Sequence, residues 1–311
     1  MKRGILFIFL LTTCVCGAQD ATFNNTHHSL VSMNPSFAGS NGHIRNQTGY
    51  RNQWPNLSGQ YVTYGSCLDG YIKPLNGGVA MNVTSDDQAR GTLRLTTISL
   101  AYAQFISIGN NLKIIPSIQA GYSQYTLDKG RLNFGDRVNA RFNSIWYSST
   151  VPESIVRYRD LSAGLLFKYG GNYIGVSCAH LAEPNISLFR DEVYKLPIKT
   201  IIHASHNGMM NTRTTSNVSC VVSTQGPYQS FSMRILNCYS ERFLYGLGYG
   251  YFNSNEMALF FGFRAGGFTI NYSYDVAISK LSGNTAGSHE LSVSLAFKKK
   301  NAGRSPDLES R

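Results

Sequence analysis

The stretch Phe268-Thr269-Ile270-Asn271-Tyr272-Ser273-Tyr274-Asp275 alternates strictly between large apolar or aromatic residues and small or polar ones. Successive side chains of an extended strand point to opposite faces, so the four large residues share one face and the four polar residues share the other. A large apolar outside with a polar inside is typical of a strand that lies between lipid and a wet lumen. The stretch therefore predicts one strand of an outer-membrane β-barrel.

The same alternation recurs along the whole chain and predicts about fourteen strands. Since lipid cannot satisfy the open edges of a sheet, the expected fold is all-β, a single antiparallel transmembrane β-barrel. The strands are expected at roughly 42–51, 59–71, 77–85, 93–107, 111–127, 159–169, 172–182, 198–208, 215–225, 228–238, 242–252, 255–265, 267–276 and 288–297.

Short and long connections alternate along the chain, so the short turns gather at one end of the barrel and the long loops at the other. Tight turns are expected at Leu75-Asn76-Gly77, Gly109-Asn110-Asn111, Gly170-Gly171 and Gly266-Gly267. Long loops are expected at 85–92, 128–158, 183–197 and 277–287, with two tight exceptions on the same side at Gly226-Pro227 and Asn253-Ser254-Asn255. Outer-membrane barrels place their short turns in the periplasm. An even number of strands then returns both ends of the barrel to the periplasmic side.

The amino terminus has the form of a secretory leader. Lys2 and Arg3 precede an apolar run, and Cys16-Gly17-Ala18 forms a small-residue cleavage site before Gln19. A lipoprotein signal with Cys14 as the acylated residue is the alternative. We therefore expect a signal peptide at 1–18 and the barrel at 19–297. Within that unit, 19–41 would be a short periplasmic lead-in, and 298–311 would follow the barrel as a polar tail.

Composition limits the classes of partner. The formal charge is +11, but the cations are scattered and the chain is exported, so we expect no nucleic acid. Anionic lipid headgroups, lipopolysaccharide and acidic protein surfaces suit a basic exported chain better. Charged residues make up 14% of the chain and aromatic residues 12%, which suits strands with aromatic girdles and argues against disorder.

No residue pattern predicts catalysis, a metal site or a cofactor. Four histidines lie in or near expected strands, and no nucleophile elbow or His-Glu-x-x-His pair accompanies them. His203 and His206 are three residues apart and should face opposite sides of one strand. A strand histidine is then best explained as a hydrogen-bonding group of the lumen. The cysteines beyond the leader are expected to be free thiols, since Cys220 and Cys238 fall on opposite faces.

Two stretches carry the more specific signals. In the first, Asn34-Pro35 and Gly39 indicate a tight turn that leads into the first strand. Farther along that stretch, Tyr50-Arg51 and Gln53-Trp54 predict an aromatic belt at the far end of the strand, with Arg51 able to pair with acidic groups or lipid phosphate.

The second stretch lies at the carboxyl end of the barrel. It comprises 271–276, which contains Asp275, and 288–297, which contains Glu290 and ends on Phe297. Leu291, Val293 and Leu295 alternate outward there. This pattern is typical of a terminal strand that the outer-membrane assembly machinery recognises.

Together these stretches resemble the PorP/SprF family of Bacteroidetes outer-membrane proteins, which serve type IX secretion and gliding motility. The residues that carry the resemblance are 34–39, 50–54, Gly77-Gly78-Val79, Ala179-His180-Leu181-Ala182-Glu183-Pro184, and 274–276 through 290–297. Two departures from the family pattern are the run 86–91 after the third strand and the tail beyond Phe297.

The resemblance implies a non-enzymatic role in the outer membrane, without a cofactor. The chain would support export or surface anchoring of secreted proteins. Its partners would be outer-membrane lipid, periplasmic type IX secretion components and a secreted client or adhesin. The site residues it suggests are Asn34, Pro35, Gly39, Tyr50, Arg51, Gln53, Trp54, Asp275, Glu290 and Phe297. The alternative is a pore for diffusion or uptake of small solutes through a lumen of Ser, Thr and Asn, in which the basic balance of the chain would favour anions.

Overall fold

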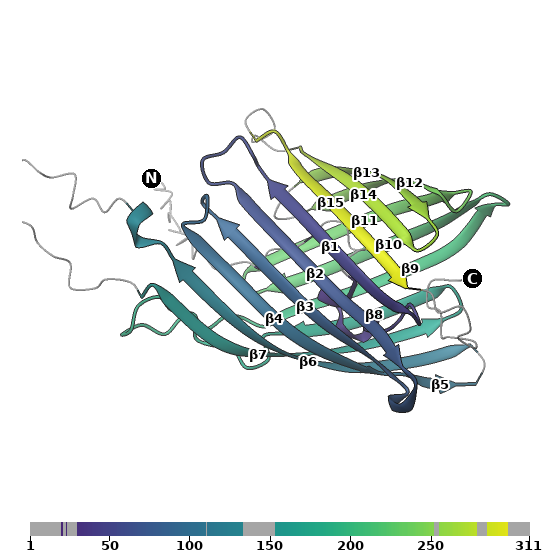
Figure 1. The fold of residues 1–311 in the computed structure, drawn as a ribbon, viewed down its shortest axis with the longest axis horizontal. Helices are drawn as coiled ribbons and strands as arrows, with labels where there is room; N and C mark the ends of the chain where they lie inside the picture. Colours follow the sequence, from purple (N-terminus) through teal and green to yellow (C-terminus); the bar gives the residue numbers. More distant parts are fainter. Residues whose placement is uncertain are drawn as a thin grey trace, which may run out of the picture.

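The protein is a nearly all-β molecule in which long tilted strands surround a lumen (Figure 1). The computed structural model describes residues 20, 23, 30–109, 111–132, 153–251, 255–278 and 285–297. The leader 1–18, the tail 298–311 and most of the loop expected at 128–158 therefore lie outside the described residues. Among those described, no helix combines the length and hydropathy that a membrane crossing needs.

The elements follow one another as alternating strands and turns after a short helical start. In chain order they are α1 Leu30–Met33, η2 Pro35–Phe37, β1 Ile44–Gln53, β2 Tyr61–Ile72, η3 Lys73–Leu75, β3 Gly77–Gln88, β4 Leu93–Gln104, β5 Ile106–Ile108, β6 Leu112–Leu127, η4 Lys129–Arg131, β7 Ile155–Tyr169, β8 Asn172–Ala179, β9 Lys199–Asn211, β10 Thr214–Gln225, β11 Tyr228–Tyr239, β12 Phe243–Tyr251, β13 Glu256–Ala265, β14 Phe268–Ala277 and β15 Ser288–Phe297.

The strands form one closed antiparallel barrel of fourteen strands, with β5 as an extra short strand. The first strand, β1, pairs with the last, β15, and β4 pairs with β6 to complete the ring. The expected strand at 93–107 is divided in two because Phe105 leaves the ladder. Its N–H donates to the carbonyl of Asn76 at 3.1 Å, and its ring is buried in the lumen.

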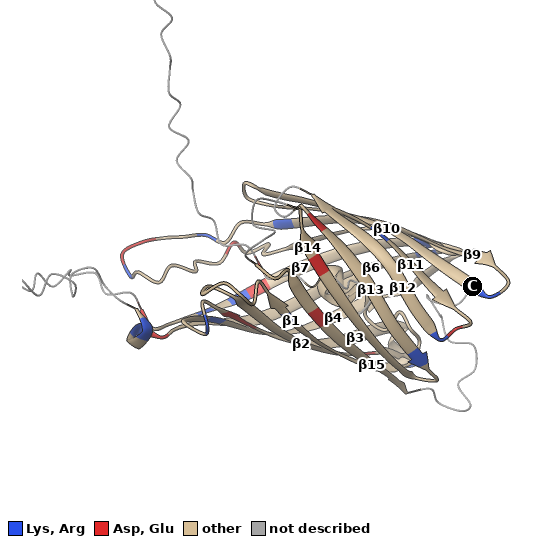
Figure 2. Cartoon of the chain, turned by 90° about the horizontal axis from the view of Figure 1, so that it is seen from above, with Lys and Arg blue, Asp and Glu red and all other residues tan. Residues whose placement is uncertain are grey.

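The sequence alternation sets which side chains face the lumen. In β14, Thr269, Asn271, Ser273 and Asp275 are buried inside the ring, whereas the alternating aromatic residues face outward. The outer wall presents large apolar side chains. Most residues of the strands are neither basic nor acidic (Figure 2). This confirms the predicted face assignment, because an apolar exterior is what a lipid environment requires.

The two ends of the barrel differ as expected, with one correction: the long loop expected at 85–92 is a short turn at 89–92, because β3 continues to Gln88 and β4 begins at Leu93. One end, the turn end, carries the tight β2–β3, β7–β8 and β13–β14 connections, the start of β1 and the end of β15. The other end, the loop end, carries the long β6–β7, β8–β9 and β14–β15 connections.

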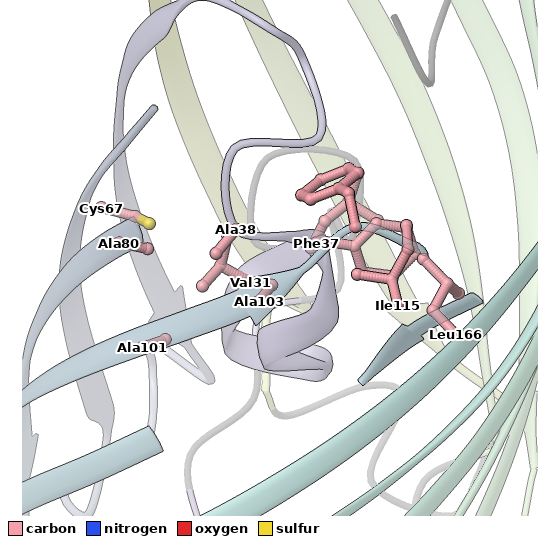
Figure 3. Close-up of a cluster of buried hydrophobic side chains, with 11 residues drawn as sticks. Val31, Phe37, Ala38, Cys67, Ala80, Ala101, Ala103, Ile115 and Leu166 are labelled. Carbon is pink, nitrogen blue, oxygen red and sulfur yellow. The ribbon is translucent and has the colours of Figure 1, made fainter. Parts of the chain in front are cut away.

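The segment before β1 corrects one expectation. It was expected as a periplasmic lead-in, but α1, η2 and the residues up to Gly39 lie inside the barrel (Figure 3). Leu30, Val31 and Phe37 are buried against Ile115 and Leu166 of the wall. The segment enters the lumen because its helix is apolar, and burying apolar surface away from water is favourable. We call residues 30–39 the plug.

Candidate functional site

The plug is held by a buried asparagine whose amide meets three elements. The Asn34 side-chain oxygen accepts the N–H of Ser36 at 2.9 Å, which caps the 3₁₀ turn η2. Its Nδ2 donates to the carbonyl of Val176 at 3.2 Å and lies 3.0 Å from Nε2 of His203. Pro35, which follows, occupies the first position of the turn, where its missing N–H costs nothing. The predicted tight turn is therefore present, but it lies inside the lumen.

Glycines of the wall let the plug approach the strands. A Cβ on Gly164 would lie 2.2 Å from the side-chain oxygen of Asn34, and one on Gly78 would lie 1.9 Å from the carbonyl oxygen of Ala38. Gly39 has φ +66° and faces the same crossing. A side chain at these positions would clash, so the plug backbone packs directly on the backbone of Gly78, and the Asn34 side chain packs directly on Gly164.

An ion pair fixes the end of the plug. Arg45 Nε donates to Asp69 at 3.0 Å, and the N–H of Gly39 donates to the same carboxylate at 3.1 Å. Arg45 and Asp69 are almost fully buried. Charge-assisted hydrogen bonds of this kind are stronger than neutral ones, so the chain is tightly tethered where it leaves the plug for β1.

A second buried charge cluster joins the first strand to the last two. Arg51 Nη1 donates to Asp275 at 2.6 Å and to Glu290 at 3.3 Å, and all three side chains are at most about 5% exposed. Arg51 thus pairs with acidic groups in the lumen and not with lipid phosphate. Arg234 of β11 is buried near the same carboxylates. The structure therefore brings three of the predicted site residues together.

The other predicted site residues lie elsewhere on the barrel. Tyr50 faces outward, and its ring centroid lies 5.3 Å from that of Tyr64. Trp54 packs edge-on against Tyr61 at 6.0 Å, next to Gln53, the last residue of β1. Phe297 ends β15 and is exposed at the turn end. These aromatic residues fit an outer girdle, which is separate from the lumen.

Sequence reasoning missed a cluster at the loop end that holds Asp20. The Asp20 carboxylate lies 2.9 Å from Nε2 of His180 and 3.4 Å from Nζ of Lys199, and His180 Nδ1 lies 2.8 Å from Asp160. Asp20 and His180 are 160 residues apart, so no local pattern could signal this contact. We call these four residues the latch.

The charges of the latch reinforce one another. Burial alone would lower the pKa of His180, but the hydrogen bonds to Asp160 and Asp20 outweigh it and raise the pKa to about 9. Burial alone would raise the pKa of Asp20, but Lys199 and His180 hold it well below its usual range. The latch therefore joins the His180 imidazolium to the Asp20 carboxylate at neutral pH.

The loop-end half of the lumen contains a cavity of about 330 Å³. Hydroxyl and amide side chains line most of it, and Arg234, Glu256 and the latch stand at its edges. On β12 the lumen face is nearly bare, because Gly248 and Gly250 occupy inward positions. Such a lining offers hydrogen bonds to a polar ligand and holds no catalytic arrangement that we recognise among the described residues.

The β8–β9 loop covers part of the loop end. Ile186 and Leu196 of this loop are buried against the inward-facing Tyr125 and Tyr158. Its tip stays in solvent, where Val193 is 74% exposed. The loop is therefore an ordered surface that stands above the cavity.

His203 and His206 fall on opposite faces of β9, as the sequence predicts. His203 is buried in the lumen with the plug, whereas His206 on the other face is exposed beside Asn172. The four described cysteines are free thiols. Among the described residues, no three His, Cys, Asp or Glu side chains form a group that could hold a metal ion.

Comparison with known proteins identifies a family. A family model described as "Type IX secretion system membrane protein PorP/SprF" matches residues 15–295. No curated protein matches the chain.

Solved outer-membrane barrels share the fold. The toluene transporter TbuX of Ralstonia pickettii has a TM-score of 0.52 at 12% identity, over 87% of this chain and 94% of that one. The CymD monoaromatic hydrocarbon channel also has a TM-score of 0.52 at 12% identity, over 91% and 96%. At such low identity the likeness concerns the fold alone.

Proposed function

Because the chain belongs to the type IX secretion system membrane protein family PorP/SprF, we propose that it is a non-enzymatic outer-membrane scaffold that supports export or surface anchoring of secreted proteins. The observation that carries the proposal is the plug, which is packed against the wall inside the lumen. A conduit for a polypeptide needs a clear path, whereas a scaffold needs rigid ends that partners can contact.

The plug supports a scaffold role because its contacts hold it firmly against the wall of the barrel. Asn34 has no exposed surface, and Gly78 and Gly164 bring the wall within backbone distance of the plug. Moving the plug would break the Gly39–Asp69 hydrogen bond and expose the buried apolar cluster around Phe37.

Each end of the barrel offers a different partner surface. The turn end would face the periplasm and contact secretion components there, for instance through the exposed Met209 and Met210 of the β9–β10 hairpin. The loop end would face outward and contact a secreted client or adhesin through the tip of the β8–β9 loop, where Phe189 and Val193 are exposed. A role in gliding motility would use the same surfaces if the client is a motility adhesin.

Co-purification from native outer membranes tests this assignment. The matched variants are Phe189→Ser with Val193→Ser at the loop end, and Met209→Ser with Met210→Ser at the turn end. We expect the first pair to reduce recovery of the secreted client and the second to reduce recovery of periplasmic components. The reverse result would mean that the barrel has the opposite orientation in the membrane. Unchanged recovery with both pairs of variants would contradict the scaffold proposal.

A pore for small solutes is the competing function, and the loop-end cavity favours it. TbuX and CymD are described as a transporter and a channel, although their likeness to this chain concerns fold. Purified protein in planar bilayers separates the two functions. A scaffold with a fixed plug should give little conductance, whereas steady anion-selective current from the unmodified protein would favour the pore.

A further inference from the structure

Phe23 lies in a socket of small residues on the β1–β2 wall. Gly49 of β1 pairs directly with Gly65 of β2, and both glycines sit at lumen-facing positions. A Cβ on Gly65 would lie 2.9 Å from the Phe23 ring, and one on Gly49 would lie 3.2 Å away. Ser292, which is opposite Gly49 on β15, is also small. The missing side chains therefore leave a space that the aromatic ring fills.

The socket and the latch face one another across the lumen. Phe23 contacts β1 and β2, whereas Asp20 contacts residues at the ends of β8, β9 and β10, on the opposite side of the ring. The two residues are three positions apart, and an extended chain covers roughly 10 Å in three residues. Asp20 also donates its own N–H to Gln225 at 3.4 Å. Recognition at this site thus combines a carboxylate, an aromatic ring and a backbone amide.

The remaining lining of the cavity suits an extended peptide. Ser162, Gln119, Gln229 and Ser232 line the same cavity as Asp20 and Phe23. Hydroxyl and amide groups hydrogen-bond to peptide N–H and C=O groups of any sequence, so they hold a backbone without selecting side chains. The volume of about 330 Å³ that stays open lies within the range of ligand pockets.

We infer that the loop-end lumen is a peptide-binding site for extended segments that carry a carboxylate three residues before an aromatic ring, and that the chain's own Asp20 and Phe23 occupy it. The latch binds the carboxylate and the glycine socket binds the ring. The inference goes beyond the scaffold role, since it concerns what the barrel itself binds. A tethered segment acts at an effective concentration on the order of millimolar, so a free peptide binds well only when the resident segment is weakened.

A competition experiment with the full-length protein tests the inference. The probe is a fluorescent peptide with the sequence of residues 19–29, and the protein variant is Asp20→Asn combined with Phe23→Ala. We expect this variant to bind the probe at least about tenfold more tightly than the unmodified protein does. Fluorescence anisotropy in detergent measures both affinities, and heat-modifiable migration in gels checks that each barrel is folded.

Matched probes and one further variant establish specificity. Probes that carry Asp20→Asn or Phe23→Ala should each bind the vacated protein at least about tenfold more weakly, and so should the unmodified probe when His180→Asn is added to that protein. If the double variant does not fold, Asp20→Asn alone serves as the vacated protein. Equal binding of all probes, or no gain in the vacated protein, would overturn the inference. Because only purified protein is used, neither result depends on the secretion role.

Discussion

The two halves of the lumen differ in the chemistry of the residues that line them. In the turn-end half, the backbone of the wall meets the backbone of the plug at Gly78, the side chain of Asn34 lies against Gly164, and apolar side chains pack around these contacts. In the loop-end half, Arg51 and His180 belong to two separate clusters of buried charges, and the His180 cluster borders a cavity. The comparison shows that the close-packed plug and the polar cavity lie at different positions along the barrel axis. Close packing tolerates no change of shape, whereas polar groups around open space accept different occupants.

The largest effect is expected from breaking the Arg51 cluster. Arg51→Ala leaves Asp275 and Glu290 buried without this partner, which should lower the free energy of unfolding by about 3–5 kcal/mol. Arg94→Ala is the control, because Arg94 pairs with Asp87 at the exposed loop end and such pairs contribute at most about 1 kcal/mol. Urea unfolding in lipid vesicles, followed by circular dichroism, measures both. Similar losses would mean that the loop-end charges are not desolvated.

The comparison of the two halves presumes that lipid surrounds the wall. Val293 faces outward on β15, so Val293→Arg should cost about 2–4 kcal/mol if it lies near the bilayer midplane. Val293→Leu keeps the apolar surface and should leave stability nearly unchanged. The same urea titration applies. A tolerated arginine would show that this face of the barrel does not contact hydrocarbon.

A single methyl group should disturb the turn-end half. Gly78→Ala places a Cβ against the carbonyl of Ala38, and we expect a loss of about 1–3 kcal/mol together with a rise in bilayer conductance as the plug shifts. Gly59→Ala is the matched control, since nothing lies within 4 Å of its Cβ position. An unchanged conductance and stability for Gly78→Ala would show that the plug is loosely held.

The smallest effect is a pH dependence confined to the loop-end half. The folded pKa of His180 is raised to about 9, so its contribution to stability is fully present below the ordinary value of about 6.5 and is lost as pH rises through about 9. Asp20→Asn should lower the His180 pKa, which NMR of labelled histidine would detect. Asp87→Asn, far from the latch, is the control. An unmoved His180 pKa in the Asp20 variant would contradict the geometry of the latch.

Most of the fold was predictable because a strand encodes its faces locally. The alternation from Phe268 to Asp275 assigns each side chain to lipid or lumen, and glycine pairs such as Gly170-Gly171 mark the turns. Boundaries were less predictable. β8 ends at Ala179 because His180 adopts φ 59°, a left-handed backbone that the pattern of apolar residues does not reveal.

The site was predictable only in part. Asn34, Arg51, Asp275 and Glu290 could be chosen as unusual residues, yet nothing local shows that the first enters the lumen or that the others meet. Asp20 could not be found at all, because its partners come from distant strands and only barrel closure brings them together.

The Arg51 cluster has a consequence for how the barrel is assembled. Arg51 lies directly opposite Glu290 across the seam between the first and last strands, and a slip of two residues would place it opposite Ser288 or Ser292 instead. A slip of one residue would turn every side chain of the strand to the wrong face. The ion pair between Arg51 and Glu290 therefore favours the correct register of the first strand against the last. The first strand carries a cation whose two carboxylate partners, Asp275 and Glu290, come only with the last two strands.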